Sequence, residues 1–292
     1  MPSGIALKHS GLKCLTTFFA FLLPLLWPLP QASSCTLWAA VGNRVQGGGA
    51  LIAKNRDMPP DHRQELRLVK PPSGFRYFGL VALDSDEPGV KAGVNEKGLV
   101  IVDAAASCIP QCLRDQRPEV EHLNEKLLSA CADVDAVLRR QLMFLAPAYY
   151  LVADPSQAVI LEVALDGSRA VTRITQGTLT HTNHYLNVDF QEDNLKMNPG
   201  SPLRLQRIRD LLAGHPQPLT LADFIVFSGD RHDGPDQSIW RRGSTARKIR
   251  TLASWIVRLP RDGAPTVYVR LANPGEPPAT KQLQLDRTFW ER

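Results

Sequence analysis

The sequence is poor in several features that mark particular classes of protein. Only five of its 292 residues are cysteine, no segment repeats, and 34 basic against 29 acidic side chains give a formal charge of +5. A composition that is 43% apolar and 22% charged excludes wholesale disorder and a fibrous repeat. Beyond the first 34 residues no apolar run approaches the length that crosses a membrane. The length then allows one large globular domain or two small ones.

The start of the chain has the features of a secretory signal. A basic opening without acidic residues is followed by the apolar run 15–29, which two prolines interrupt. The small residues Ala32 and Ser34 occupy the −3 and −1 positions of a cut before Cys35. This pattern predicts a signal peptide over residues 1–34 and an exported protein, periplasmic or secreted. The alternative is an uncleaved N-terminal anchor.

Removal of the signal changes the balance of charge and of cysteine. Taking 34 from 292 leaves 258 residues, and the loss of two lysines lowers the charge from +5 to +3. A charge this small does not indicate nucleic-acid binding. Cys14 is lost as well, which leaves four cysteines, and Cys108 and Cys112 are the local pair that could form a disulfide in an exported protein.

A mature chain that begins with Cys35 allows two chemical interpretations. In the first, Cys35 is lipidated, although Ala32 replaces the leucine that a lipoprotein signal normally has at −3. In the second, Cys35 is an N-terminal nucleophile whose own α-amine serves as the base. An α-amine with a pKa of about 7.7–8.0 can accept the proton of a thiol with a pKa of about 8.5 and later return it to a leaving amine.

The residues after Cys35 favour the second interpretation. Two strand-like segments, 36–41 and 50–57, flank a glycine-rich turn, and antiparallel pairing about the turn sets residue 35 opposite residue 56. Asn55 and Asp57 then lie beside the terminal cysteine, where a carboxylate could hold an ammonium group. Asp57 also begins a turn with the prolines that follow it.

This opening, CTLWAAVGNRVQGGGALIAKNRDMPPD, resembles the mature start of the N-terminal nucleophile amide hydrolases. It is most similar to the acyl-coenzyme A:6-aminopenicillanic acid acyltransferase group, and it also resembles choloylglycine hydrolases and penicillin V acylases. In these families a G-R-N-x-D pattern follows the cysteine by about twenty residues. Here Lys54 replaces the arginine, which keeps the charge but loses the bidentate fork.

Three later segments continue the resemblance in the same order. They are Gly93–Leu99, which is similar to a G-x-NEKGL pattern, Thr182-Asn183-His184, and Ser201–Arg207. The resemblance implies that Asn183 donates to the oxyanion and that Arg204 is an active-site arginine which orders the Cys35–Asp57 pair. It also implies that Lys54 and Asn55 position this pair.

Two departures from the families weaken specific assignments. Bile-salt hydrolases have an oxyanion asparagine where this chain has Ala105, so a backbone N–H would have to serve, and a bile-salt or penicillin V specificity is in doubt. The acyltransferase group exposes its nucleophile by self-cleavage at Gly-Cys, whereas Ser34 precedes Cys35 here. Signal cleavage is therefore the simpler route to a free terminus.

The remaining pattern predicts an α+β fold. We expect a helix over 121–145, a hairpin over 148–163, helices over 202–212 and 219–227, and strands over 169–175, 179–181, 251–259 and 266–271. The resemblance implies a four-layer αββα sandwich of two antiparallel sheets formed by residues 35–292. Residues 278–292 are expected to form a C-terminal tail, with Trp290 as its anchor.

Other candidate sites are weaker. His181 and His184 have no third partner in the sequence and do not indicate a metal site. The basic residues from Arg241 to Arg250 suggest a solvated or anion-facing surface, and this is where an anionic substrate such as acyl-coenzyme A would be sought. Asp230 and His232 suggest a conventional Cys-His-Asp triad, which is redundant if the α-amine is free.

The sequence therefore predicts an exported amidase or acyltransferase that works through an acyl-enzyme on Cys35. We expect no metal and no cofactor, a small amide substrate with acyl-coenzyme A or another acyl donor as an option, and no nucleic-acid partner. Contact with a membrane is expected only through the signal or a lipid anchor, and homo-oligomerisation stays open. The rival hypotheses are a non-catalytic lipid-anchored envelope protein with the same fold and a secreted hydrolase with a Cys-His pair. The acyl chain, the amine, and the choice between hydrolysis and transfer remain open.

Overall fold

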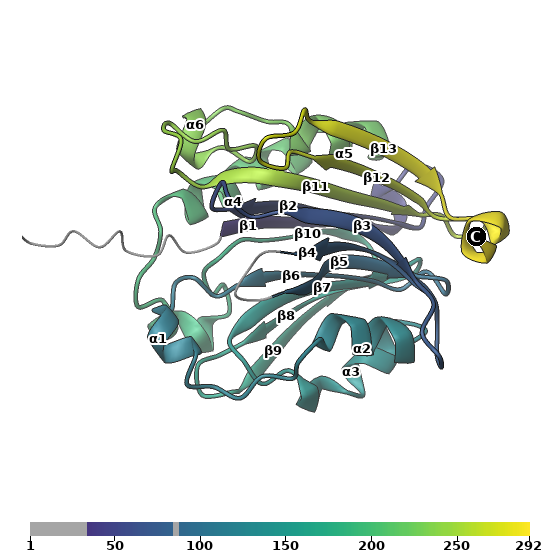
Figure 1. The fold of residues 1–292 in the computed structure, drawn as a ribbon, viewed down its shortest axis with the longest axis horizontal. Helices are drawn as coiled ribbons and strands as arrows, with labels where there is room; N and C mark the ends of the chain where they lie inside the picture. The colour runs from purple at the N-terminus through teal and green to yellow at the C-terminus, as the bar shows by residue number, and fades with distance from the viewer. Residues whose placement is uncertain (1–33, 84–87) are drawn as a thin grey trace, which may run out of the picture. The chain divides into compact units, whose positions relative to one another are not determined.

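The structure, a computed structural model, describes residues 34–83 and 88–292 as two antiparallel β-sheets packed face to face (Figure 1). The expected signal peptide lies outside the described residues except for Ser34. The strands are β1 (Ser34–Val41), β2 (Ala50–Met58), β3 (Gln64–Val69), β4 (Tyr77–Ala82), β5 (Gly89–Asn95), β6 (Val100–Ala105), β7 (Ala148–Asp154), β8 (Gln157–Val163), β9 (Arg169–Ile174), β10 (Gly177–His181), β11 (Arg250–Leu259), β12 (Thr266–Leu271) and β13 (Ala279–Gln284). The helices are α1 (Gln111–Arg114), α2 (Leu123–Ala130), α3 (Val134–Leu138), α4 (Gly200–Ala213), α5 (Leu221–Ser228), α6 (Gly234–Gln237) and α7 (Arg287–Glu291), with short 3-10 turns η1 (Gly42–Arg44), η2 (Gln141–Met143) and η3 (Val188–Asp193).

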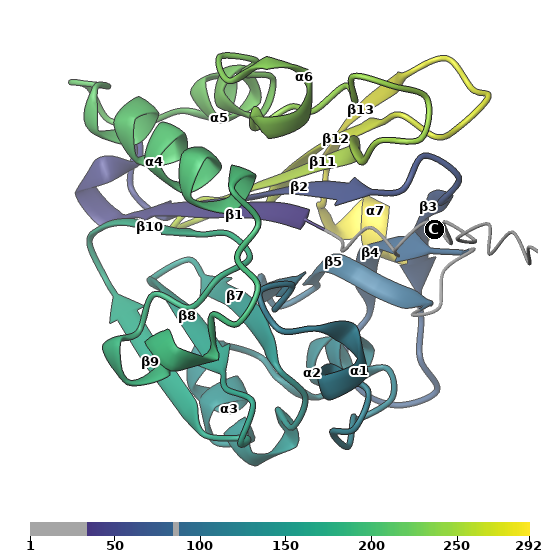
Figure 2. The ribbon, with the colours of Figure 1, turned by 90° about the vertical axis from the view of Figure 1, so that its left-hand side faces the viewer.

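The sheets have the orders β10-β1-β2-β11-β12-β13 and β3-β4-β5-β6-β7-β8-β9. Helices α4 and α5 cover the outer face of the first sheet, and α2 and α3 cover the outer face of the second (Figures 1 and 2). One apolar core fills the space between the sheets, and one lies under each helical layer. This is the four-layer αββα sandwich of the expected fold class.

The alternation of β1 explains how one strand serves two cores. Leu37 and Ala39 point into the space between the sheets, whereas Trp38 and Ala40 pack under the helices, where the Trp38 ring lies 5.9 Å from that of Phe224. Both faces of β1 are thus buried, which explains its nearly continuous apolar sequence.

The β1–β2 hairpin has the register predicted from its turn. Cys35 pairs with Arg56, and Ser34 pairs with Asp57. The turn depends on glycine, because Gly49 has φ +86° and a Cβ there would lie 2.1 Å from the carbonyl oxygen of Leu259.

The helix expected over 121–145 is wrong in its extent. It is interrupted after α2, where Cys131 is extended, and α3 begins anew after Asp133, whose side chain accepts a hydrogen bond from the N–H of Ala136. The N-cap preference of aspartate therefore prevails over the continuous spacing of leucines. Among the described residues no helix is long and apolar enough to cross a membrane.

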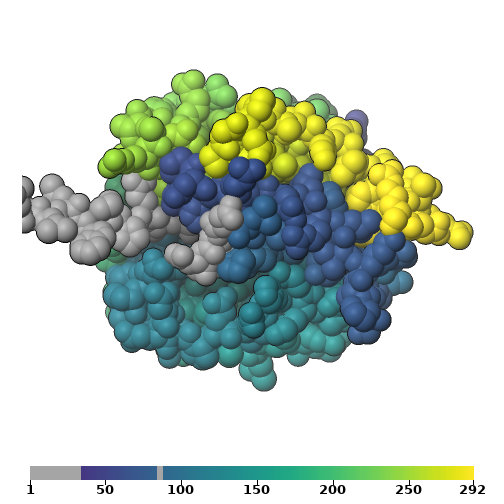
Figure 3. All heavy atoms as spheres, viewed as in Figure 1, coloured from purple at the N-terminus to yellow at the C-terminus, as the bar shows by residue number. Residues whose placement is uncertain are grey.

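The C-terminal segment is an ordered part of the first sheet rather than a tail. Strand β13 extends the sheet at its edge, and α7 places Phe289 and Trp290 in the core between the sheets. The main-chain oxygen of Trp290 accepts a hydrogen bond from Arg76 at 2.8 Å. In the space-filling view the yellow C-terminal residues lie directly against the blue residues of the early strands (Figure 3).

Candidate active site

Cys35 lies at the start of β1, a central strand of the first sheet, with only 4% of its surface exposed. Its side chain belongs to the core between the sheets. Its nitrogen, an amide here because the chain continues to Ser34, occupies the place of the expected α-amine. That nitrogen donates a hydrogen bond to Oδ1 of Asn183 at 2.7 Å.

Asp57 lies directly across the strand pair from Ser34, and both are fully buried. Its Oδ1 accepts a hydrogen bond from the hydroxyl of Thr251 at 2.7 Å, and its Oδ2 is 3.7 Å from Nη1 of Arg241. Burial raises the pKa of the Asp57 carboxyl, while Arg241 and Arg204 act in the opposite direction. Oδ2 of Asp57 has no hydrogen-bond partner, so the carboxylate retains capacity for a further donor.

Asn183 and Arg204 form a fixed frame around the nitrogen of Cys35. Arg204, which is fully buried in α4, donates from Nη2 to Oδ1 of Asn183 and from Nε to the hydroxyl of Thr36, each at 3.1 Å. Burial lowers the pKa of Arg204 to about 10, which still leaves it charged at neutral pH. The Asn183 oxygen thus receives two donors and is held on the Cys35 nitrogen.

The amide nitrogen of Asn183 is the group that the resemblance assigns to the oxyanion. It donates one hydrogen to the carbonyl oxygen of Ala105 at 2.9 Å, and its second hydrogen has no acceptor among the described residues. Ala105 therefore does adjoin the site, and its contact with Asn183 is made by its carbonyl oxygen.

Lys54 is the positive charge that acts most strongly on the thiol. It is 2% exposed, and its Nζ lies 2.6 Å from Oδ1 of Asp103 and 2.7 Å from the carbonyl oxygen of Lys91. Burial raises the pKa of the Cys35 thiol, and Lys54 is the largest influence that lowers it. Asp103 was not apparent as a site residue from the sequence, because nothing local in strand β6 distinguishes it.

Asn55 is placed differently from the expectation that it positions Cys35 and Asp57. Its amide nitrogen donates to the carbonyl oxygens of Ser228 and Ile239, each at 2.8 Å, so its side-chain donors are directed away from Cys35 and Asp57. Asn55 instead ties β2 to the segment that leads to Arg241.

A buried hydrogen-bonded pair, Glu162 and His181, supports the loop that carries Asn183. Glu162 accepts a hydrogen bond from Nε2 of His181 at 2.7 Å and from the N–H groups of Leu186 and Asn187 at 3.0 Å. Nδ1 of His181 lies 3.0 Å from the carbonyl oxygen of Thr182. The pair therefore holds both ends of segment 182–187.

The other candidates take no part in these side-chain contacts, although the main-chain N–H of Cys108 donates to the carbonyl oxygen of Asn183 at 3.2 Å. Cys108 and Cys112 are both free, and the Cys108 sulfur is 3.2 Å from the hydroxyl of Tyr149. Asp230 forms an ion pair with Arg207 at 2.6 Å, and His232 is exposed. Within the described ranges there is no group of three or more His, Cys, Asp or Glu side chains that could hold a metal ion.

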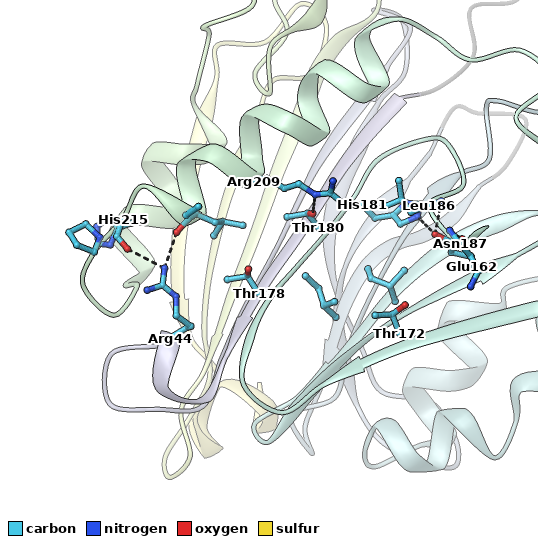
Figure 4. Close-up of a pocket in the computed structure, with 15 residues that line it drawn as sticks. Arg44, Glu162, Thr172, Thr178, Thr180, His181, Leu186, Asn187, Arg209 and His215 are labelled. Carbon is cyan, nitrogen blue, oxygen red and sulfur yellow. Dashed lines mark hydrogen bonds and ion pairs between the residues drawn. The ribbon is translucent and has the colours of Figure 1, made fainter. Parts of the chain in front are cut away.

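A cavity of about 720 Å³ lies elsewhere on the sandwich, along β10 (Figure 4). Arg44 and His215 mark one end, and Glu162, His181 and Asn187 mark the other. None of the residues predicted to act on Cys35 is among its described lining residues. Glu162 and His181 line the cavity and also bind the main chain of the segment that carries Asn183.

Comparison with known proteins identifies the family and the fold of the chain. The sequence model named acyl-coenzyme A:6-aminopenicillanic acid acyl-transferase matches residues 44–276. A search of curated proteins gave no match. Two crystal structures of variants of the conjugated bile acid hydrolase from Clostridium perfringens share the fold at 12% identity. They have TM-scores of 0.56 and 0.54, covering 86% and 85% of this chain and 92% of each of theirs. The match over most of the chain shows that it belongs to the acyl-coenzyme A:6-aminopenicillanic acid acyl-transferase family, enzymes of the N-terminal nucleophile hydrolase and acyltransferase type.

Proposed function

We propose that this enzyme is an exported amidase or acyltransferase that cleaves a linear amide through a thioester on Cys35. In this proposal, removal of residues 1–34 turns the nitrogen of Cys35 into a free α-amine. One observation carries the proposal: the nitrogen of Cys35 donates a hydrogen bond of 2.7 Å to Asn183. Cys35 occupies the strand position next to Ser34, which pairs with Asp57.

The acylation step uses groups that adjoin this nitrogen. The α-amine takes the thiol proton, the sulfur forms a bond to the amide carbon, and the carbonyl oxygen becomes an oxyanion that the free N–H of Asn183 stabilises. The carbon–nitrogen bond then breaks as the ammonium returns its proton to the departing amine. The Cys35 thioester and a free α-amine remain.

Deacylation reverses these roles. Water or an acceptor amine gives a proton to the α-amine and attacks the thioester carbon, and the thiolate leaves and recovers that proton. Water yields a carboxylic acid, whereas an amine yields a new amide. The balance between them depends on the access of water to the acyl-enzyme.

The surrounding charges suit both steps. The Asp57 carboxylate, with its unpartnered Oδ2, stabilises the ammonium form of the α-amine, and the place filled by Ser34 becomes available to the departing amine. Lys54 stabilises the thiolate between the sheets. The rival hypothesis of a non-catalytic lipid-anchored protein is not favoured, because the family consists of enzymes.

The proposal is tested with a protein that begins at Cys35 and a panel of linear amides. We expect turnover and, after rapid quenching, a mass increase equal to the acyl group on Cys35. Cys35→Ala abolishes turnover, and acetylation of the α-amine lowers it by about 10²-fold or more, since a general base contributes roughly that much.

His232→Ala is the control, because this exposed side chain has no role in the scheme and the variant keeps its activity. Full activity of Cys35→Ala, or of the protein with a blocked amine, contradicts the mechanism. The intact mass of the exported protein tests the terminus, since an added diacylglyceryl group would identify the lipid anchor instead.

A further inference from the structure

A second cavity, of about 420 Å³, lies beside the active site and is lined by an unusual number of arginines. These are Arg241, Arg242, Arg250 and Arg270. Glu276 is the one carboxylate among the described lining residues, and its oxygens already accept hydrogen bonds from Arg63 and Asn273. The cavity therefore carries a net positive charge that no lining group balances.

Arg241 connects this arginine pocket to the active site. Its main chain is fixed to Thr251 by hydrogen bonds of 2.8 and 2.9 Å, and Thr251 is also the residue that donates to Asp57. The Arg241 side chain is about 7% exposed, yet its Nε and Nη1 have no hydrogen-bond partner. Nη1 is 3.7 Å from Asp57, which is too far for a hydrogen bond. Because buried donors without hydrogen bonds are costly, Nε and Nη1 of Arg241 are suited to receive the oxygen atoms of a ligand.

Two further arginines are held in place around the same space. The guanidinium of Arg270 lies 4.0 Å from the ring centre of Trp240, and such stacking leaves its N–H edge free. Arg250 donates to the carbonyl oxygen of Thr245 at 3.0 Å, while its buried Nε has no partner. Planar guanidinium groups fixed in this way suit carboxylate or phosphate oxygens.

We propose that the arginine pocket binds an oxyanionic group, a carboxylate or a phosphate, of the amide substrate. This inference rests on the proposed function, because the route from the pocket to Cys35 passes through Asp57. Ser34 pairs with Asp57 across the strands, and Nη1 of Arg241 lies 3.7 Å from the same carboxylate. A substrate whose scissile amide lies in the place of Ser34 can therefore extend its charged group to Arg241.

Binding is measured without catalysis, on the Cys35→Ala protein that begins at residue 35. Inorganic phosphate and acetate are titrated by calorimetry. We expect both anions to bind, and the one that binds more tightly identifies the class of oxyanion. Arg270→Gln or Arg242→Gln weakens the binding about tenfold, as expected for the loss of one charged hydrogen bond. Arg247→Gln is the matched control, since this exposed arginine belongs to the same basic segment but does not line the pocket. Equal binding by all four proteins, or none by the parent, overturns the inference.

A kinetic comparison separates the site from the proposed function. Amides of one acyl group with glycine and with glycinamide, and with phosphoethanolamine and ethanolamine, differ only in the anion. In the active protein the anionic member of one pair has a kcat/KM about tenfold higher, and Arg270→Gln removes this preference. Turnover without any preference overturns the anion site and leaves the proposed function intact. Anion binding that depends on Arg270 without turnover of any amide supports the site and contradicts the proposed function.

Discussion

At the scale of single residues, the site depends on a few charges that are buried almost completely. Lys54, Asp57 and Arg204 are each 2% exposed or less, and each has an opposite charge or a hydrogen-bond partner close by. Charged groups are costly to bury unless they are paired, so the residues that pair with them are also needed to build the site. Asp103 is one such partner, because it holds the ammonium of Lys54.

The influence of Lys54 on the thiol predicts a pH effect. Lys54 lowers the pKa of Cys35, so Lys54→Met raises that pKa and reduces the thiolate present at any given pH. The midpoint of iodoacetamide alkylation moves upward by about one pH unit or more, a typical effect of one nearby charge. The measurement is the alkylation rate against pH in the protein that begins at Cys35.

Lys54→Arg and a double variant serve as controls for this prediction. Lys54→Arg keeps the charge and retains the midpoint of the parent protein. Lys54→Met leaves the carboxylate of Asp103 without its ion-pair partner, and the double variant with Asp103→Asn removes that carboxylate as well. An upward shift of the alkylation midpoint in the double variant therefore cannot come from Asp103 alone. An unchanged midpoint in both methionine variants would rule out Lys54 as the group that stabilises the thiolate.

At the scale of elements, strand β8 supports the loop that follows β10. Glu162 of β8 holds His181 and the main chain at Leu186 and Asn187, so it fixes the segment with Asn183 from both ends. Burial alone would raise the pKa of Glu162, but the bonds from His181 and from the main-chain N–H groups keep it below its usual value of 4.5.

Glu162→Gln therefore changes both catalysis and acid stability. A looser Asn183 lowers kcat more than it raises KM, by about tenfold overall. Because the folded-state pKa of Glu162 is lowered, its contribution to stability is present above about pH 4.5 and is lost as the pH falls through the folded-state pKa. The free energy of unfolding of Glu162→Gln thus falls less steeply with acid than that of the parent.

Denaturant unfolding from pH 7 to pH 3 and steady-state kinetics check this prediction. Glu192→Gln is the control, because it removes an exposed carboxylate of η3. A Glu162→Gln protein with unaltered kcat and the same acid dependence as the control would show that the pair does not support Asn183.

Elements also differ in how well the sequence predicts them. The hairpins β1–β2 and β7–β8 were predicted closely, because glycine and Asp-Pro turns mark their centres. Strand β13 was missed because an exposed edge strand has polar residues along most of its length, so no alternation distinguishes it from a loop. The break between α2 and α3 had one local signal, the N-cap residue Asp133.

At the scale of the whole molecule, the sandwich encloses the bond whose cleavage would create the active site. Ser34 is 0% and Cys35 is 4% exposed, and both residues pair with strand β2. A peptidase binds its substrate as an accessible extended segment, which a paired central strand cannot offer. We therefore propose that a signal peptidase, if it makes this cut, acts before the domain folds.

This order of events predicts the outcome of a timed digestion. The full chain is cut before Cys35 when membranes that contain signal peptidase are present during translation. It remains uncut there when the membranes are added after folding. Intact mass measures both products. Equal cleavage after folding contradicts the prediction, and cleavage without any peptidase would identify self-processing as the route.

The sequence by itself determined the register of the first hairpin and the α+β class, and it singled out Cys35 as the proposed nucleophile, because all three depend on local patterns. A cysteine after small residues, a glycine turn between two apolar segments, and separate runs of strand and helix are each legible within about twenty residues. The order of the later motifs added Asn183 and Arg204 through a family resemblance.

Only the tertiary structure decided which distant side chains surround Cys35. Asp103, Thr251 and Arg241 come from separate strands and loops, and Asn55 is directed away to the main chain of Ser228 and Ile239. These contacts arise from the pairing of β11 with β2 and from the packing of two sheets, which join residues up to about 200 positions apart. No local pattern encodes such a contact, because each partner alone is an ordinary polar residue on a strand or in a loop.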